Sequence, residues 1–430
     1  MRKTFNERYQ ETYYEETLDN GLHVILWHKP DYEKSLFMMA TPLGATDLKQ
    51  VDENQKTYTF PAGIAHFLEH KMFEIEQGDV MDMFSNIGAN VNAFTSYTET
   101  VYYFSTSSDF VKPLHLLLDF VQDLHISEQS VEKEKGIIIQ ELNMYKQMSD
   151  QRLLMEIFTS LFKEHPLKFD IGGDSESVSG TTLQQLEECY HINYHPSTMV
   201  LVGVSGEDPK RIMEEIKQNQ EAKTFPEAKK ISTVIWEEPK EVARKEYTFY
   251  MDVSMPKVCV VYKLEGIKDP YERLKREWCI KIMLDTHFST LNKDFQTWLD
   301  EGILNDYSGC EIDLGEDYGF LLFFCETSKI EAFEKIVERV MENIKAAQIE
   351  TSTLSQLKKR YFAQGIRSLN SFDDIAVSCV RNYFQKVDYF KAIEVLENIT
   401  KEQIQETCTS LKLDAKAKVY LKPEKKNINL

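Results

Sequence analysis

The stretch PAGIAHFLEHKMF, residues 61–73, decides how the rest of the chain is interpreted. It holds two histidines and a glutamate in the order H-x-x-E-H, namely His66, Glu69 and His70. Apolar residues at helical spacing on the other flank predict a helix here: Ile64, Phe67, Leu68 and Met72. In a helix the two histidines lie one turn apart on one face, so both imidazoles can reach a single metal ion.

The pattern reverses the commoner H-E-x-x-H order and keeps its chemistry. Two histidines act as metal ligands, and the carboxylate of Glu69 acts as a base on a water rather than as a ligand. The same residues also fit an ordinary helix with two packed or capping histidines and a surface glutamate. A catalytic zinc site has three protein ligands and one open position, so a third ligand separates the two interpretations.

The third ligand is best sought in residues 128–147, EQSVEKEKGIIIQELNMYKQ. Glu134 and Glu141 are two helical turns apart in this segment and share a face. Acidic residues on a helix usually form a solvated face, which is the expected position of Glu128 and Glu132. Glu141 instead follows the apolar run GIII and precedes Leu142. A carboxylate in such surroundings is costly unless it is paired or bound to a metal.

Composition limits the broad class of protein. With 430 residues, the chain is long enough for at least two domains. A net charge of −20 argues against nucleic-acid binding, which needs a basic stripe. The acidity could steer cationic peptides to the protein, although solubility is the simpler reason for it. No segment approaches the roughly 20 apolar residues of a membrane span. The polar N-terminus lacks a secretory signal and the seven cysteines are scattered, so we expect a cytoplasmic protein.

The two halves of the chain repeat one order of elements: strands, helix, hairpin, helices, strand. The β-rich segments of the first half are 21–27, 35–46, 91–107 and 201–206. Those of the second half are 243–265, 310–327 and 417–423. The order predicts an α+β fold of two homologous domains of about 200 residues, each a mainly antiparallel sheet packed with helices.

The polar, proline-containing stretch 221–240 is predicted to be a linker. It separates an N-terminal domain, residues 1–220, from a C-terminal domain, residues 241–430. Residues 270–301, the counterpart of the motif helix, contain no histidine pair. We therefore expect the metal site only in the first domain.

Several segments together resemble a known family. In chain order they are HFLEH, NAFTSYTETVYYF, VEKEKGIIIQELN, HPLKFDIGG and YHPSTMVLVGVSG. They resemble the pitrilysin/insulinase-type zinc metallopeptidases, whose motif is H-x-x-E-H. Within that family the chain is similar to the small two-domain branch related to mitochondrial processing peptidase, and it most resembles the zinc-protease-like proteins of Firmicutes. The likeness covers nearly the whole chain and is most specific in its first half.

The resemblance implies a zinc endopeptidase, or inverzincin, with one Zn²⁺ ion per chain. His66, His70 and Glu141 match the three metal ligands of the family. Glu134 matches the carboxylate that supports the site, and Glu69 matches the general base, which takes a proton and then delivers it to the leaving amine. Asn92, Ala93 and Phe94 match the strand that binds substrate by β-augmentation; an ordinary sheet edge is the other interpretation.

Two side chains that the resemblance leads us to expect, an arginine and a tyrosine, are missing. Active relatives provide an arginine and a tyrosine to the oxyanion from a segment that corresponds to WLDEGILNDY, residues 298–307. Trp298 and Asn305 hold those two positions, and Tyr307 lies nearby. We therefore expect a homologous non-catalytic partner to supply the arginine and tyrosine, the two chains forming a closed chamber for peptides.

Other arrangements and functions stay open. A homodimer is the rival assembly, but it leaves both oxyanion positions unfilled. The chain could also be a non-proteolytic scaffold subunit of a complex, or a peptide-binding factor that works beside a biosynthetic enzyme. A scaffold has no need of an acid cluster beside two histidines, so the ligand set favours the peptidase.

Overall fold

The computed structural model describes residues 1–75, 78–346 and 348–424, and these form two compact units. The first unit comprises Met1–Asn143, Phe169–Val234 and Ile366–Tyr389. The second comprises Met144–Lys168, Ile235–Gly365 and the described residues from Phe390 onward. Each unit thus takes one segment from the other half of the chain. The domains predicted from the sequence, 1–220 and 241–430, are continuous stretches of the chain, and their boundaries remain a prediction.

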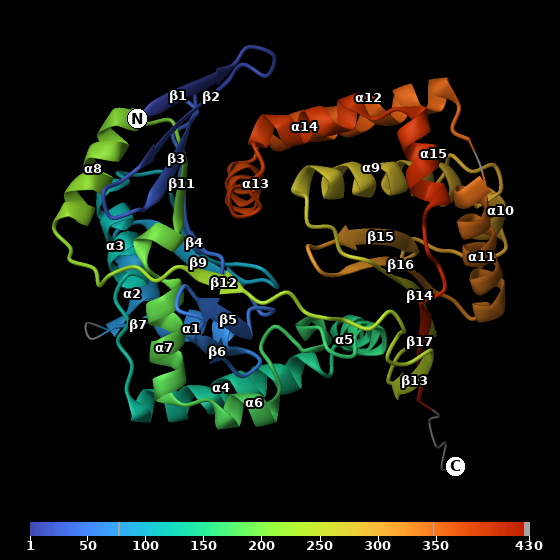
Figure 1. The fold of residues 1–430 in the computed structure, drawn as a ribbon, viewed down its shortest axis with the longest axis horizontal. Coiled ribbons are helices and arrows are strands. Elements are labelled where there is room, and N and C mark those ends of the chain that lie inside the picture. Colours follow the sequence, from blue (N-terminus) through green and yellow to red (C-terminus); the bar gives the residue numbers. More distant parts are fainter. Residues whose placement is uncertain (76–77, 347, 425–430) are drawn as a thin grey trace. The chain divides into compact units, whose positions relative to one another are not determined.

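The first unit is built on a seven-stranded sheet (Figure 1). Across the sheet, its strands are β1 (Arg2–Asn6), β2 (Glu11–Thr17), β3 (His23–His28), β11 (Val200–Ser205), β4 (Ser35–Thr41), β10 (Thr100–Thr106) and β9 (Ala89–Thr95). Only the β3–β11 pair is parallel. A small sheet of β12 (Ile231–Thr233), β5 (Lys49–Asp52) and β6 (Thr57–Thr59) accompanies it. β12 lies within the stretch predicted as a linker, and the β1–β2 hairpin was not predicted.

Helices cover both faces of this sheet. Every residue of β4 and β11 is buried, because alternate side chains enter the cores on the two sides. Three helices share the main core on one face: α1 (Ile64–Met72), α3 (Val111–Val121) and α8 (Pro209–Glu221). The other face packs against α13 (Phe372–Phe384), where the indole Nε1 of Trp27 donates to Sγ of Cys379 at 3.0 Å.

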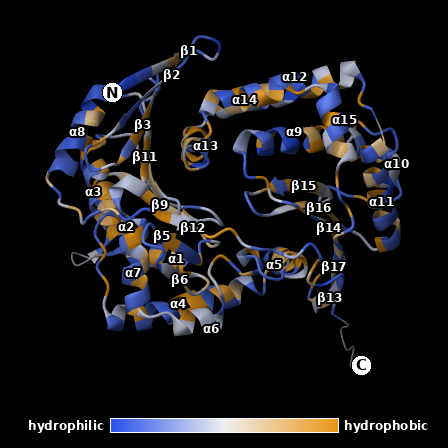
Figure 2. Ribbon diagram, in the orientation of Figure 1, coloured by the Kyte–Doolittle hydropathy of each residue, from blue (hydrophilic) through white to orange (hydrophobic). Residues whose placement is uncertain are grey.

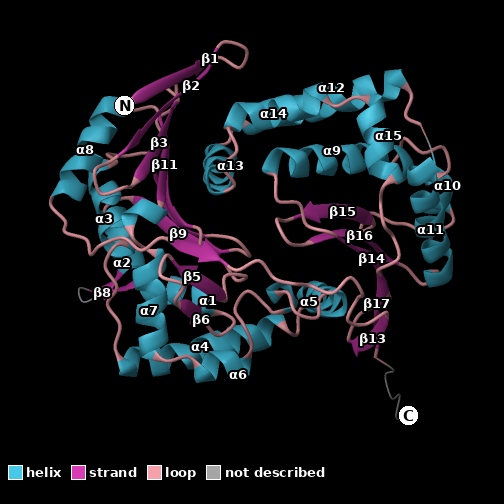
Figure 3. Cartoon of the chain, in the orientation of Figure 1, coloured by secondary structure: helices cyan, strands magenta, loops and turns pink. Residues whose placement is uncertain are grey.

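The second unit has a five-stranded sheet of the same kind (Figure 3). Its order is β13 (Glu246–Met251), β17 (Lys416–Pro423), β14 (Lys257–Leu264), β16 (Gly319–Glu326) and β15 (Gly309–Leu314). Its main core includes residues of α9 (Pro270–His287), α11 (Ile330–Ala346) and α15 (Lys401–Thr409). On the other face lies α5 (Ser149–Leu161), whose Phe158 ring packs edge-on against Phe320.

The remaining helices complete the two units. They are α2 (Val80–Asn86), α4 (Glu128–Tyr145), α6 (Ser175–Gly180), α7 (Leu183–Asn193), α10 (Phe295–Asp300), α12 (Thr351–Ser368) and α14 (Tyr389–Asn398). Figure 2 shows hydrophobic and hydrophilic residues interleaved along these helices, as expected for helices with one face in a core. No helix in the described ranges has both the length and the apolar character for crossing a membrane.

The two sheets match strand for strand. The order β3-β11-β4-β10-β9 in the first unit corresponds to β13-β17-β14-β16-β15 in the second. The only parallel pair occupies the same place in each, β3 with β11 and β13 with β17. The predicted α+β fold of two homologous domains is therefore confirmed, and β17 holds the position that was predicted for 417–423.

Glu277 of α9 provides a pH test of the second unit. Its carboxylate accepts a hydrogen bond from the backbone N–H of Leu314 at 2.9 Å, and burial raises its pKa from 4.5 to about 7. The folded chain then keeps a proton that the unfolded chain releases, so the free energy of unfolding falls as pH rises from about 4.5 to about 7. We expect Glu277→Gln to stabilise the protein by about 1–3 kcal/mol near pH 8 and hardly at all near pH 4.5.

Urea unfolding of both proteins at the two pH values measures this difference. An equal effect at both would contradict the prediction, since it would mean that the folded carboxylate titrates as it does in the unfolded chain.

Candidate metal centre

The motif helix α1 begins at a backbone position that only glycine fits well. Gly63 precedes the helix with φ of 87°, and an added Cβ would lie 2.3 Å from the carbonyl oxygen of Gly172. A Cβ on Gly172 would in turn lie 3.3 Å from Nδ1 of His66. The two glycines therefore let the 170–174 loop pack directly on the start of α1 and against the ring of His66.

Burial of the apolar side of α1 leaves the motif residues on its other side. Ile64, Phe67, Leu68 and Met72 are each at most 1% exposed and belong to the main core. His66, Glu69 and His70 are only partly buried. The helix predicted over this stretch is therefore present, and its core contacts leave the three polar side chains outside the main core.

Helix α4 brings the acidic residues to α1. Ile138 and Leu142 are buried in the core, 0% and 3% exposed, and they orient the helix. Ile137, the first isoleucine of the apolar run GIII before Glu141, is instead 44% exposed. Residue 137 lies about 100° around the helix from residue 138, so burial of one turns the other outward. The side chains of Glu134 and Glu141 remain only 12% and 24% exposed.

The structure brings together the three residues predicted as ligands. One potential ligand atom from each of His66, His70 and Glu141 lies within 4.8 Å of the others. The Oε2 atom of Glu141 is 3.8 Å from Nε2 of His66 and 3.4 Å from Nε2 of His70. Ligand atoms about 2.0–2.1 Å from a tetrahedral zinc ion would lie about 3.3 Å apart, so these residues fit zinc in spacing and in donor type. That they hold zinc remains a prediction.

The two histidines are held in different ways. Nδ1 of His70 lies 3.1 Å from Oε1 of Glu134, a hydrogen bond that fixes the ring with Nε2 towards Glu141. Nδ1 of His66 is buried and has no hydrogen-bond partner among the described residues. The orientation of His66 therefore depends on packing, and that of His70 on a carboxylate.

The electrostatics of the cluster favour a cation. Burial, together with the neighbouring His70, lowers the pKa of His66 to about 4, so this imidazole is neutral, as a metal ligand must be. Burial also acts to lower the pKa of His70, but the carboxylates of Glu134 and Glu141 outweigh it and raise this pKa to about 9. Two carboxylates thus converge on one ring and attract positive charge there.

Glu69 is linked to the edge of the sheet. The hydroxyl of Thr95, at the end of β9, donates to Oε2 of Glu69 at 2.6 Å. Burial raises the pKa of Glu69, and the hydrogen bond from Thr95 opposes that change. One carboxylate oxygen of Glu69 is thereby fixed in place beside the histidines.

The predicted substrate strand is an edge strand. β9 pairs with β10 on one side only, with Asn92 opposite Tyr103, Ala93 opposite Tyr102 and Phe94 opposite Val101. Among the described residues no strand pairs with its other side. The backbone groups there are placed to receive an extended peptide, which is the arrangement that β-augmentation needs.

The residues at the expected arginine and tyrosine positions have structural contacts within the second unit. Trp298 is 5% exposed and part of the main core of that unit. The side-chain Nδ2 of Asn305 donates to the backbone oxygen of Glu326 at 2.9 Å, and the Tyr307 hydroxyl donates to Asp150 at 2.7 Å. In this structure each of the three side chains serves a contact inside its own unit.

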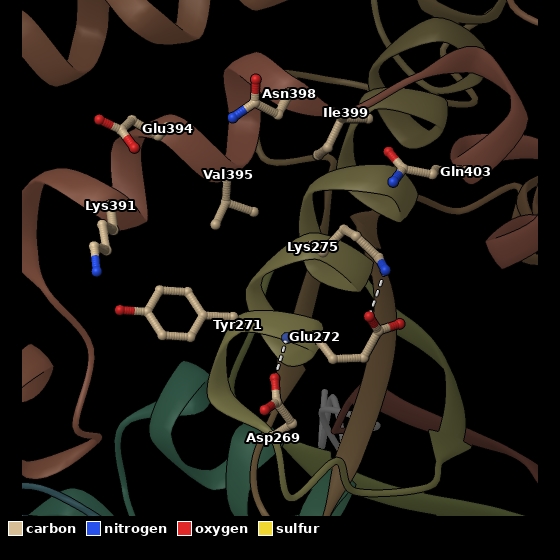
Figure 4. Close-up of a pocket in the computed structure, with 10 residues that line it drawn as sticks. All are labelled: Asp269, Tyr271, Glu272, Lys275, Lys391, Glu394, Val395, Asn398, Ile399 and Gln403. Atoms are coloured by element: carbon tan, nitrogen blue, oxygen red, sulfur yellow. Dashed lines mark hydrogen bonds and ion pairs between the residues drawn. The ribbon is translucent and has the colours of Figure 1, made fainter.

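A surface groove of about 530 Å³ lies in the second unit (Figure 4). It is lined mainly by residues of α9 and α14, and two local contacts join polar groups of its α9 side. Asp269 accepts from the backbone N–H of Glu272 at 2.7 Å, and the Glu272 side chain pairs with Lys275. The lining includes no histidine or cysteine, so the groove lacks the combination of residues that the His66 cluster brings together.

Two polar residues of the site were not predicted. Thr95 follows the predicted strand residues directly, but its bond to Glu69 depends on α1 lying beside β9, which no local pattern reveals. Lys71 is 0% exposed and adjoins His70. A lysine among the apolar positions of an amphipathic helix is a signal that could have identified it, because a buried ammonium group needs a partner.

Comparisons with known proteins show which proteins the chain is similar to. The chain matches the family model of insulinase, peptidase family M16, over residues 56–175 and that of the peptidase M16 inactive domain over 181–361. An uncharacterized zinc protease of Bacillus subtilis, YmfH, is 35% identical over 93% of this chain and 94% of its own length. The crystal structure of an M16-like peptidase from Alicyclobacillus acidocaldarius, 31% identical, covers 96% of this chain and 99% of its own, with a TM-score of 0.91.

A third relative is the mitochondrial-processing peptidase subunit beta of Neurospora crassa. It is 28% identical over 203 residues, which are 46% of this chain and 41% of that protein.

The glycine before α1 gives a test of how the centre is positioned. We expect Gly63→Ala to destabilise the protein by about 1–3 kcal/mol, because alanine must adopt a positive φ and its Cβ meets backbone. The start of α1 should shift, and zinc binding should weaken. Thermal unfolding and a chelator-competition titration measure the two effects.

The matched control is Gly136→Ala in α4, where an added Cβ has no neighbour within 4 Å. This change should be neutral or should stabilise by about 0.5–1 kcal/mol. Equal effects of the two substitutions would show that the contact between residues 63 and 172 is unimportant.

Proposed function

Because this chain belongs to the insulinase family, peptidase family M16, we propose that it is a zinc-dependent endopeptidase that cleaves short or unfolded peptides. The observation that carries the proposal is the convergence of His66, His70 and Glu141, with Glu69 one residue from His70 and fixed by Thr95. Its relatives in Bacillus subtilis and Helicobacter pylori are named zinc proteases.

In this proposal His66, His70 and Glu141 hold one zinc ion. When bound, zinc supplies a Lewis acid that polarises a peptide carbonyl and makes a water acidic near neutral pH. The carboxylate of Glu134 accepts a hydrogen bond from Nδ1–H of His70. This bond favours the tautomer protonated at Nδ1, in which the lone pair of Nε2 is free and faces the cluster. The side chains of the three ligands thus contribute position and charge, and Glu134 fixes the orientation of one of them.

Glu69 is the proton carrier of the proposed reaction. With Oε2 bonded to the hydroxyl of Thr95, the carboxylate is held in place to take a proton from the attacking water and pass it to the amine of the cleaved peptide. The buried setting raises the pKa of Glu69, which suits a group that must both accept and release a proton.

The edge of β9 is the proposed substrate-binding element. Asn92, Ala93 and Phe94 precede Thr95, so a peptide paired with this edge would run past the residue that contacts Glu69. A peptide must be extended to pair with a sheet edge. Folded proteins do not offer such a segment, and this supports short or unfolded substrates.

We propose that a homologous partner completes the site as a heterodimer. Trp298 is a core residue and Asn305 binds backbone, so neither position offers the arginine or tyrosine of active relatives. The match to a processing-peptidase beta subunit, a protein named as one subunit of an assembly, supports a paired arrangement. All seven cysteines are unpaired, which supports a reducing, cytoplasmic location.

The second candidate function is a non-proteolytic peptide-binding or scaffold subunit. The match of residues 181–361 to a domain described as inactive is the observation that favours it. The convergence of two histidines and a glutamate favours the peptidase, since a scaffold has no need of a set of metal ligands.

The variant Glu69→Gln separates the two functions. We expect it to retain zinc and to lose peptide cleavage by about 100- to 10,000-fold, because an amide cannot take up the proton. Metal analysis and mass spectrometry of peptides incubated with the assembled protein measure both properties.

The matched control is Glu132→Gln, a glutamate on α4 whose side chain is 66% exposed and pairs with Lys135. It should retain both zinc and activity. Cleavage undiminished in Glu69→Gln, or no zinc in the wild-type protein, would overturn the peptidase proposal.

The partner proposal predicts that the purified chain alone cleaves peptides at no more than a trace rate. Activity should appear when a sequence-related subunit with the arginine–tyrosine segment is added, because donors for the oxyanion are then present. A pull-down of the native chain identifies that subunit. Ordinary enzyme rates from the isolated chain would show that no partner is needed.

A further inference from the structure

Lys71 is a charged residue at a core position of the motif helix. It is 0% exposed and one of the largest fully buried side chains in the described part of the chain. Its position follows Ile64 and Phe67 along the buried side of α1, at i+7 and i+4. An ammonium group in such a place is strongly destabilising unless it is paired.

The partners of Lys71 are two glutamates. Its Nζ pairs with Glu74, just after the end of α1, and lies 3.8 Å from Oε2 of Glu134 on α4. The Glu74 side chain is 48% exposed, whereas that of Glu134 is 12% exposed. Of the two contacts, the one with Glu134 is therefore the less screened by solvent and connects α1 to α4.

Glu134 bridges the lysine and the histidine. Its Oε2 faces Lys71, and its Oε1 is 3.1 Å from Nδ1 of His70. Each oxygen therefore has a different partner, and rotation of the carboxylate would break both contacts. Because Nδ1 of His66 has no hydrogen-bond partner in the described residues, His70 is the histidine whose orientation a carboxylate can control.

We propose that Lys71 is a positioning residue of the metal centre: its ammonium group holds Glu134 on Nδ1 of His70 and thereby sets the affinity of the site for zinc. The inference rests on the proposed zinc site and deepens it. Within the described residues, no hydrogen bond or ion pair joins the lysine side chain to a predicted ligand or to the substrate edge, so its effect passes through Glu134.

Simple charge repulsion predicts the opposite sign. If Lys71 acted only as a positive charge near a bound cation, its removal would make zinc bind more tightly. If it acts by fixing Glu134, its removal weakens zinc binding, because His70 loses its fixed orientation. The direction of the change therefore decides between the two effects.

The test compares Lys71→Met, Glu134→Gln and the double variant in the full-length chain. Methionine fills the buried space without charge, and thermal unfolding of the metal-free proteins checks that each folds. Zinc affinity is measured by chelator competition, and the visible spectrum of cobalt-loaded protein reports the geometry of the ligands.

We expect Lys71→Met to weaken zinc binding about 10-fold and to change the cobalt spectrum. In the Glu134→Gln background the same substitution should change affinity less than about threefold, since the lysine then has no carboxylate to position. Unchanged or tighter zinc binding in Lys71→Met would overturn the proposal. An equal loss in both backgrounds would also overturn it, because Lys71 would then act independently of Glu134.

The matched control is Lys29→Met. Lys29 is a buried lysine of the same unit, bonded to Glu11 at 2.5 Å and to the backbone oxygen of Leu369 at 2.8 Å. Its loss should lower thermal stability and leave zinc affinity unchanged. Zinc binding without peptide cleavage by the protein assembled with its partner would refute the proposed function and leave this inference standing, whereas a wild-type protein that binds no zinc would refute both.

Discussion

The contact between the carboxylates of α4 and the histidines of α1 is the interaction on which the rest of the site depends. His70 lies between Glu134, 3.1 Å from its Nδ1, and Glu141, 3.4 Å from its Nε2. These groups are largely removed from solvent, so each of them would be costly without the others. The apolar sides of the two helices carry the packing energy, and Ile138 and Leu142 of α4 place the acids opposite the histidines. Burial of apolar residues thus brings charged groups together that would not associate as strongly in water.

The sheet connects this cluster to a place where a peptide can bind. Thr95 contacts Glu69 and ends β9, so the proposed base and the proposed substrate edge lie on two elements that are in direct contact. The second unit repeats the sheet with the same strand order, but its helix α9 carries no histidine pair and its Trp298 lies in the core. One fold therefore appears twice in the chain, and within the described residues the candidate metal-binding cluster appears once. Duplication conserves the packing of strands and helices, because the apolar pattern specifies it, and leaves the partly exposed positions free to differ.

Much of the site could be predicted because its signals are local. His66 and His70 are one helical turn apart, and the apolar residues around them fix which side of α1 they occupy. Glu141 was indicated by its apolar neighbours, although Ile137 proved to be exposed. Thr95 could not be found in this way, because the partner of a hydroxyl in a strand can be identified only when the helix beside that strand is known. The role of Lys71 also depends on a neighbour 63 residues away, Glu134.

The sequence by itself determined the two homologous α+β domains, the motif helix and the candidate ligands, because hydrophobic periodicity records which face of each element is buried. It did not reveal the β1–β2 hairpin, whose polar, partly exposed strands lack a clear alternation. Only the tertiary structure decided that α5 packs with the second unit and α13 with the first, and that Lys71 meets Glu134. The physical reason is that a periodic pattern shows that a face must be covered and says nothing of which distant segment covers it. The partner of a buried charge is likewise chosen by the packing of whole elements.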